Sequence, residues 1–173
     1  IIDFKTNRLA ELLNICDEVT GKIIIYSRFR YDIITIKHKL ESLYGKDSVG
    51  TYYGDTPQEE RVRVIEAFED PNNPMRFFIG NPSTAGYGIT LNQANTVVYY
   101  ANDFNLETRM QSEDRCHRIG QTNKVTYIDL ITENTIDEKI VKALKDKIDI
   151  GAKVLGEEAR QWLKIDPKQK TML

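Results

Sequence analysis

The sequence contains no apolar run that approaches the roughly 20 residues needed by a membrane-spanning helix. Its densest apolar stretch, Ile23 to Tyr26, has the length of a strand. Residues 1–11 carry no signal-peptide pattern, and the chain opens on Ile1 rather than methionine, so we expect the natural N-terminus to be missing. These absences predict an intracellular protein with no membrane partner.

Cysteine is scarce, and neither sign of charge dominates. Cys16 and Cys116 have no metal-ligand spacing, which predicts reduced thiols. The 24 basic and 26 acidic residues give a net charge of −2, which argues against binding of nucleic acid by bulk positive charge but leaves a local basic face open. With 173 residues, the chain can bury a substantial core as one domain without metals or disulfides.

Three nucleotide-binding signatures are also absent. The sequence has no GxxxxGK[ST] loop, no Asp-Glu-x-His and no GxGxxG. Gly80 to Leu91 is nevertheless rich in small residues directly after a predicted strand, where a backbone can approach a ligand closely. Glycines alone are weak evidence, and a plain strand-to-helix turn is the more common explanation of them.

What is present is an alternation of apolar runs and helical patterns, which is typical of βαβ crossovers. The predicted strands cover residues 22–27, 49–53, 75–80, 96–101 and 125–131. The predicted helices cover residues 5–19, 31–43, 57–68, 106–118 and 136–155. Thr56 and Thr135 each open a capping box, so we expect their hydroxyls to begin the helices that follow. The predicted fold class is α/β, doubly wound around a parallel sheet.

Residues 111–121 carry the strongest chemical pattern. On a helix, Gln111, Arg115 and Arg118 would share one face, and two arginines there are not expected in a core because burying unpaired guanidinium groups is costly. Two such planar cations suit recognition of a phosphate group. Pairing of the arginines with Glu113 and Asp114 on a solvated helix is the alternative.

Polar and glycine-bearing segments follow several of the predicted strands. Ser27, Gly54, Ser83 and Asp103 each come just past a strand. The carboxyl ends of parallel strands meet at one edge of the sheet, where open α/β sheets bind ligands. We therefore expect these segments to form a single rim.

Four segments in chain order resemble the second RecA-like lobe of Swi/Snf-type ATPases in helicase superfamily two. They are Ile24-Ile-Tyr-Ser-Arg-Phe29, Tyr53-Gly-Asp-Thr56 with Arg61, Ser83-Thr-Ala-Gly-Tyr-Gly-Ile-Thr-Leu91, and Gln111 with Asp114-Arg-Cys-His-Arg-Ile-Gly-Gln121. The resemblance runs from about residue 22 to 158. It implies a three-layer α/β/α lobe over residues 1–158, followed by a helical extension and frayed tail at 159–173.

The resemblance also implies roles at an ATP site. Arg115 and Arg118 match the arginines of motif VI, which act as arginine fingers, and such a finger can be worth about 10³ to 10⁵ in rate. The residues implied around the nucleotide are Gly86, Gly88, Gln111 and Asp114. His117 is expected on the helix surface or between lobes, and Cys116 is expected to pack rather than react.

A second implied surface holds the phosphate backbone of double-stranded DNA. The residues that the resemblance places there are Ser27, Arg28, Gly54, Thr56, Ser83, Thr84 and Phe104. Asn81-Pro-Ser-Thr-Ala-Gly-Tyr-Gly88 departs from the pattern of nuclear remodellers, so the roles of Ser83 and Thr84 stay open. The departure, with the lack of long insertions, resembles a compact prokaryotic or viral member, which would work in the cytoplasm.

The missing signatures imply an incomplete active site. ATP and Mg²⁺ would be held mainly by an N-terminal RecA-like lobe, so this chain alone is expected to hydrolyse no ATP. The implied function is the C-terminal motor lobe of an ATP-dependent translocase on double-stranded DNA. A strand-separating helicase lobe and a non-catalytic binding module with the same fold are the alternatives, and Trp162 could mark a helix that packs back or a partner surface.

Overall fold

The computed structural model describes residues 8–85, 89–116 and 124–155, with side chains to residue 150. Its centre is a five-stranded sheet in the order β2-β3-β1-β4-β5, and every strand pair is parallel. The strands are β1 (Lys22–Ser27), β2 (Val49–Tyr52), β3 (Phe77–Gly80), β4 (Ala94–Ala101) and β5 (Thr126–Asp129). This confirms the α/β prediction, and the lobe is RecA-like in architecture.

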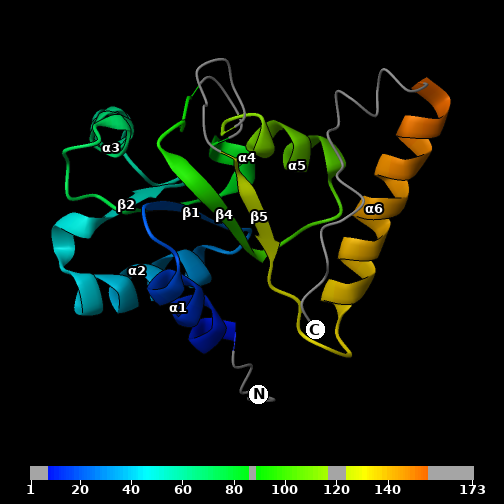
Figure 1. The fold of residues 1–173 in the computed structure, drawn as a ribbon, viewed down its shortest axis with the longest axis horizontal. Helices are drawn as coiled ribbons and strands as arrows, with labels where there is room; N and C mark the ends of the chain where they lie inside the picture. The colour runs from blue at the N-terminus through cyan, green and yellow to red at the C-terminus, as the bar shows by residue number, and fades with distance from the viewer. Residues whose placement is uncertain (1–7, 86–88, 117–123, 156–173) are drawn as a thin grey trace.

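Helices cover both faces of the sheet. They are α1 (Arg8–Glu18), α2 (Arg30–Tyr44), α3 (Gln58–Glu69), α4 (Pro82–Ala85), α5 (Leu106–Glu113) and α6 (Ile136–Leu155), with a short 3₁₀ turn at Lys46–Ser48. Figure 1 shows α1 and α2 on one side of the sheet, α3, α4 and α5 on the other, and α6 beyond the β5 edge. None of the helices in the described part of the chain has the length and apolar content needed to cross a membrane.

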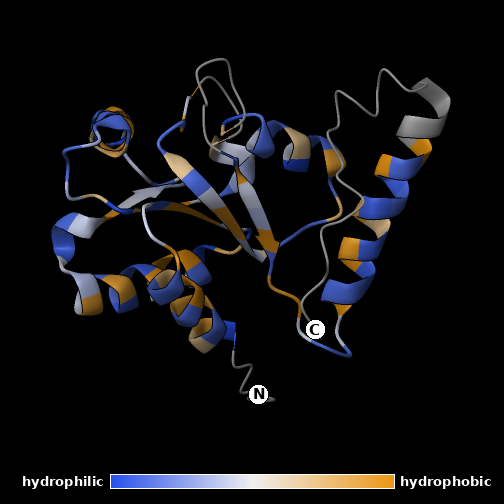
Figure 2. Cartoon of the chain, in the orientation of Figure 1, coloured by the Kyte–Doolittle hydropathy of each residue, from blue (hydrophilic) through white to orange (hydrophobic). Residues whose placement is uncertain are grey.

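The central strand β1 explains why its sequence is apolar without interruption. Ile23 and Ile25 pack in the cluster formed with α1 and α2, whereas Ile24 and Tyr26 pack in the cluster that includes α3. All four side chains are fully buried because both faces of the strand are covered. The helices differ from this strand, because the hydropathy colouring in Figure 2 shows both apolar and polar residues along each of them.

The two predicted capping boxes have different outcomes. The Thr135 hydroxyl accepts a hydrogen bond from the Asp137 N–H at 3.2 Å, as a capping residue does, and the Glu138 carboxylate accepts from the Asn134 N–H at 3.0 Å. The Thr56 prediction was wrong: α3 begins at Gln58 after Pro57, with no side-chain cap. The Thr56 hydroxyl instead accepts from the Tyr53 N–H at 3.1 Å and so closes the loop before the helix.

The predicted helix over residues 106–118 is shorter than expected. Its last helical residue is Glu113, and residues 114–116 form a turn. Gln111 and Arg115 therefore do not share a helix face, which corrects that prediction. Arg115 is also only 8% exposed, contrary to the expectation that it stays outside the core. The alternative prediction paired Glu113 with the arginines at 115 and 118. The Glu113 carboxylate instead binds Arg109 at 2.5 Å.

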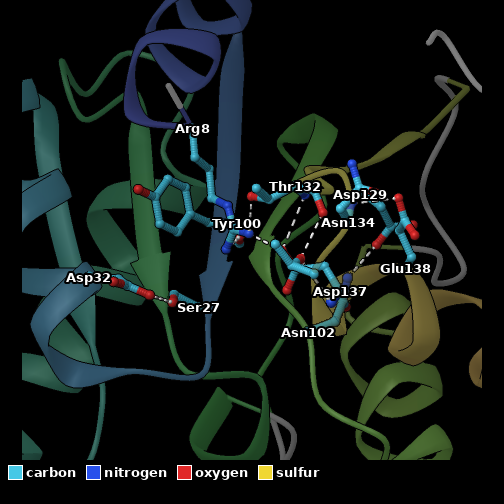
Figure 3. A network of polar contacts seen from close by, with 11 residues as sticks. Arg8, Ser27, Asp32, Tyr100, Asn102, Asp129, Thr132, Asn134, Asp137 and Glu138 are labelled. Carbon is cyan, nitrogen blue, oxygen red and sulfur yellow. Dashed lines mark hydrogen bonds and ion pairs between the residues drawn. The ribbon is translucent and has the colours of Figure 1, made fainter. Parts of the chain in front are cut away.

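The start of α6 is tied to the first helix. Arg8 of α1 donates to the Tyr100 carbonyl at 3.1 Å and the Thr132 hydroxyl at 2.6 Å, and it forms an ion pair with Asp137 in the first turn of α6. Figure 3 shows this side chain between the end of β4 and the loop before α6. These contacts join α1 to the start of α6, although Arg8 and Asp137 are 129 residues apart in sequence.

Candidate functional site

Two pockets lie at the edge where β1, β2, β3 and β4 end. The larger edge pocket, of about 240 Å³, is lined by Arg28, Asn81, Pro82, Ser83, Tyr99, Ala101, Asn102, Asp103, Thr108 and Arg109. The smaller edge pocket, of about 190 Å³, is lined by Arg28, Arg30, Ile33, Tyr53, Gly54, Asp55 and Asn81. Arg28 and Asn81 belong to both pockets, so the two hollows adjoin. The structure thus brings together four segments that the sequence predicted for one rim.

Asn81 forms hydrogen bonds that connect three of these segments. Its backbone N–H donates to the Tyr52 carbonyl at 3.1 Å, and its side-chain amide donates to the Arg28 carbonyl at 2.9 Å. Its side-chain oxygen accepts from the N–H of Ser83 at 3.0 Å and from the hydroxyl of Ser83 at 2.5 Å. One asparagine therefore sets the spacing of the loops after β1, β2 and β3, a role that the sequence did not reveal.

Two of the predicted DNA-binding hydroxyls are buried within the lobe. Ser27 is 0% exposed, donates to the Asp32 carboxylate at 2.8 Å and accepts from the Phe29 N–H at 3.3 Å (Figure 3). Thr56 is 7% exposed, and its hydroxyl is bonded within the 51–56 loop. These hydroxyls hold the loops in shape rather than facing outward.

Gly54 lies at the mouth of the smaller edge pocket with open space beside it. A Cβ atom built at this position would meet no atom within 4 Å. Arg61 of α3 holds the loop in place. Its guanidinium donates to the carbonyls of Thr56 at 2.9 Å, Tyr53 at 3.1 Å and Gly54 at 3.0 Å. Arg61 thus holds the loop through the loop's carbonyl groups, while Gly54 stays exposed.

Exposed cations flank the pockets. Arg28 is exposed, with its guanidinium 5.7 Å from the Phe29 ring centre. Arg30 forms an ion pair with Asp55 at 2.5 Å across the smaller edge pocket, and both side chains are more than half exposed. An exposed pair of this kind is weak in water, so a phosphate group could compete for Arg30. The rim therefore offers local positive charge despite the chain's net charge of −2.

The remaining predicted DNA contacts lie around the larger edge pocket. Ser83 is exposed on α4, whereas Thr84 is half-buried and its N–H donates to the Asn81 carbonyl at 3.1 Å. Phe104 is 45% exposed, and its carbonyl accepts from the Lys147 ammonium of α6 at 2.7 Å. Helix α6 therefore contacts the loop that presents this aromatic ring.

The predicted nucleotide residues are only partly within the described chain. The Arg115 guanidinium donates to the Ile89 carbonyl at 3.4 Å, and its own carbonyl accepts from the Leu91 N–H at 3.0 Å. The Gln111 amide donates to Glu107 at 3.0 Å, and Asp114 is exposed. Gly86, Gly88 and Arg118 lie outside the described residues, as do His117 and Trp162. The structure thus sets Arg115 against the segment that follows the predicted motif V glycines.

Arg109 is the most heavily bonded side chain at this edge, and sequence reasoning missed it. It contacts Asp129 at 2.5 and 3.3 Å, Glu113 at 2.5 Å and Asn102 at 3.1 Å. Its guanidinium lies 3.5 Å from the centre of the Tyr99 ring. Burial opposes its charge, yet the neighbouring acidic groups raise the pKa of Arg109 above its ordinary value. The i, i+4 spacing to Glu113 was visible in the sequence, but the pairing with Asp129 was not.

Two further properties bear on the chemistry of the site. Burial raises the pKa of the Cys116 thiol to about 12, which supports its role as a packing residue. Among residues 8–85, 89–116 and 124–150, no group of three or more histidine, cysteine or acidic side chains is placed to hold a metal ion.

The fold and its polar strand edge define the class of protein as a RecA-like lobe, and comparisons with known proteins agree. Residues 5–120 match the family described as helicase conserved C-terminal domain. The chain belongs to this family and is homologous to the C-terminal lobe of Snf2-family chromatin-remodelling ATPases.

The similar proteins include much longer chains. Protein CHROMATIN REMODELING 19 of Arabidopsis thaliana is 33% identical over 178 residues, which cover 99% of this chain and 22% of that protein. The human SWI/SNF-related matrix-associated actin-dependent regulator of chromatin subfamily A member 1 is 40% identical over 102 residues, which cover 59% of this chain and 10% of that protein. This chain therefore spans only a small part of these relatives.

Solved structures show the same fold. The C-terminal part of the Fun30 ATPase domain superposes with a TM-score of 0.73 at 27% identity, over 81% of this chain and 46% of that one. The C-terminal domain of the DEAD-box protein Dbp5 gives a TM-score of 0.68 at 20% identity, over 82% of this chain and 78% of that one. At such low identity, the second likeness concerns the fold alone.

Proposed function

We propose that this chain is the C-terminal motor lobe of an ATP-dependent translocase on double-stranded DNA. In this proposal an N-terminal RecA-like lobe of the same protein holds most of the ATP and the Mg²⁺. The present lobe supplies arginine fingers and contacts to the DNA backbone. Membership of the helicase C-terminal family supports the motor assignment.

The observation that carries the DNA assignment is the pair of adjoining pockets along one strand edge. Arg28 is exposed between them, Gly54 leaves open space, and Ser83 presents an exposed hydroxyl. Such groups suit phosphates, which are bound without regard to base sequence. Because the hydroxyls of Ser27 and Thr56 are bonded internally, we assign these two residues to shaping the loops. Thr84 and Phe104 complete the proposed surface.

For the nucleotide side we propose Arg115 and Arg118 as the arginine fingers. The residues proposed to surround the nucleotide with them are Gly86, Gly88, Gln111 and Asp114. The contacts of Arg115 with Ile89 and Leu91 support this arrangement, since they join the turn after α5 to the segment after residue 88. A finger of this kind acts by stabilising charge on the transferring phosphoryl group.

The experiment is an ATPase assay on the full-length protein, with and without duplex DNA. We expect DNA-stimulated hydrolysis, a loss of about 10³-fold or more with Arg118→Ala, and no turnover by the isolated chain. Arg63→Ala, which removes an exposed pair with Glu60, is the matched control and should leave the rate unchanged. Hydrolysis by the isolated chain that Arg118→Ala abolishes would refute the incomplete site.

Further assays separate the alternative functions. Displacement of a third strand from a duplex reports translocation, whereas release of one strand of the duplex reports a strand-separating helicase. A full-length protein that shows neither activity and no ATP hydrolysis would instead be a non-catalytic module. We also propose a compact prokaryotic or viral origin, with a cytoplasmic location. This proposal rests on the departure at Asn81 to Gly88 alone. The lack of long insertions does not support it, because the Arabidopsis relative aligns over 178 residues with 99% of this chain and is equally compact there.

A further inference from the structure

Helix α5 is attached to the sheet by polar contacts. All eight residues of α5 are described, and the one that is buried is the polar Ser112. Helices α1, α2 and α3 each bury apolar residues instead. The Ser112 and Tyr99 hydroxyls lie 2.6 Å apart, and the Tyr127 hydroxyl donates to the Glu113 carbonyl at 3.2 Å. Hydrogen bonds are directional whereas apolar contact is not, so these contacts specify one orientation of the helix.

Arg109 is the centre of this attachment. Its side chain is 12% exposed and makes four hydrogen bonds, to partners from three places in the chain. Those partners are Asp129 at the end of β5, Asn102 just after β4, and Glu113 at the end of α5. The Asn102 amide also donates to Asp129 at 2.7 Å, which closes the network (Figure 3). Breaking a partly buried pair of this kind leaves one charge without its partner, so these contacts favour one position of the side chain.

The arginine turn, residues 114–116, follows directly from α5. The Asp114 N–H donates to the Met110 carbonyl at 3.0 Å, and the Cys116 N–H donates to the Glu113 carbonyl at 3.1 Å. The turn is therefore a continuation of the last helical hydrogen bonds, and a shift of α5 moves Arg115 with it. On its other side, Arg109 lines the larger edge pocket together with Asn102 and Thr108.

We propose that Arg109 is a positioning residue that fixes α5 through Asp129 and Asn102 and thereby places the arginine turn relative to the larger edge pocket. Arg109 acts on Arg115 through the helix, and it is a ligand of neither ATP nor DNA. The inference rests on the proposed function, because a positioned arginine turn matters only if Arg115 and Arg118 act on a nucleotide. It adds a residue that the sequence motifs did not single out.

The test uses four variants of the full-length protein: Arg109→Lys, Arg109→Asp, Asp129→Arg and the double exchange Arg109→Asp with Asp129→Arg. For each, kcat and KM for ATP are measured at saturating duplex DNA, together with the melting temperature. We expect each single reversal to lower kcat by about 100-fold, the loss that a misplacement of about 1 Å can cause. The exchanged pair should recover part of the lost kcat, since the coupled residues compensate each other, but not all of it, because Glu113 then faces a carboxylate at position 109.

Arg109→Lys gives the sharpest reading because it keeps the charge and is the variant expected to fold. Lysine cannot reproduce the two-pronged contact with Asp129, so kcat should fall by about tenfold while KM for ATP changes by less than about twofold. The matched control is exchange of Glu60 and Arg63, an exposed ion pair on α3, which should leave kcat and the melting temperature unchanged.

Each result decides the matter. A wild-type kcat in Arg109→Lys would overturn the inference. A double exchange that regains the melting temperature but not kcat would show that an arginine is needed at position 109 itself, as for a ligand of the pocket, and would also overturn it. A wild-type protein without DNA-stimulated hydrolysis would remove the proposed function and this inference with it, whereas an active wild type that is insensitive to all four variants would remove the inference alone.

Discussion

Replacement of Gly54 tests whether the open space beside it is used by a ligand. A Cβ atom there would meet nothing within 4 Å, and the residue does not have the positive φ found at Gly45. Alanine should therefore fold without strain, and the free energy of unfolding should rise by no more than about 1 kcal/mol, because alanine restricts the unfolded chain. Nothing in the described part of the lobe requires a glycine at this position, so the substitution isolates the effect of a side chain on what approaches it.

Valine at position 54 should weaken DNA binding while the lobe stays folded. Its branched side chain would occupy the space through which a phosphate reaches the loop. Loss of one charge-assisted hydrogen bond costs roughly 1.5 to 3 kcal/mol, or about 10- to 100-fold in Kd. The slope of log K against log salt concentration should also become shallower by about 1. Fluorescence anisotropy with a labelled duplex over a salt series measures both quantities, and urea unfolding monitors stability.

Gly45→Val is the control for this experiment. Position 45 also has open space, but its φ of +91° disfavours a side chain, so valine there should destabilise the lobe by roughly 1 to 2 kcal/mol without changing the DNA affinity. If Gly54→Val binds duplex DNA with the wild-type affinity and salt slope, the rim does not face the DNA backbone. A loss of stability in Gly54→Ala similar to that in Gly45→Val would refute the argument from open space.

Three further predictions concern the interior. Gly50→Ala should lower the free energy of unfolding by about 1 to 3 kcal/mol, as measured by urea unfolding, because its Cβ would lie 2.7 Å from both Met75 Sδ and Val64 Cγ1. Unchanged stability would mean that β2 and α3 are loosely packed. Burial raises the pKa of Cys16 and Cys116 from near 9 to about 12. Both thiols should therefore resist a disulfide reagent at pH 8 until the protein unfolds, and rapid reaction of the native protein would contradict their burial. Between pH 9 and 12 the unfolded chain has lost these protons and the folded chain retains them, so the free energy of unfolding should fall as pH rises through that range.

The fold was largely predictable because each signal is local. The apolar run in β1 depends on neighbouring residues, and the strands fall within one or two residues of their predicted ends. The collection of polar loops at one edge followed from parallel topology alone. The adjoining pockets around Arg28 and Asn81 confirm that these loops meet.

The details of the site were less predictable because they depend on competing contacts, some with near neighbours and some with distant residues. Thr56 has the pattern of a capping residue, yet its hydroxyl is taken by the 51–56 loop. Arg115 was expected on an outer helix face, but the helix ends before it and the side chain packs beside Ile89. In both cases a local pattern was overridden by a partner that only the folded chain supplies.

By itself, the sequence determined the class of fold, the strand edge at which the polar loops meet and the family to which the chain belongs, because hydropathy period, turn residues and short motifs act over a few neighbouring positions. The tertiary structure alone decided which polar groups are bonded within the lobe and which are exposed at its pockets. Arg109 shows the reason: its Asp129 partner lies 20 residues away at the end of β5, and only the folded chain brings the two charges together and partly shields them from water.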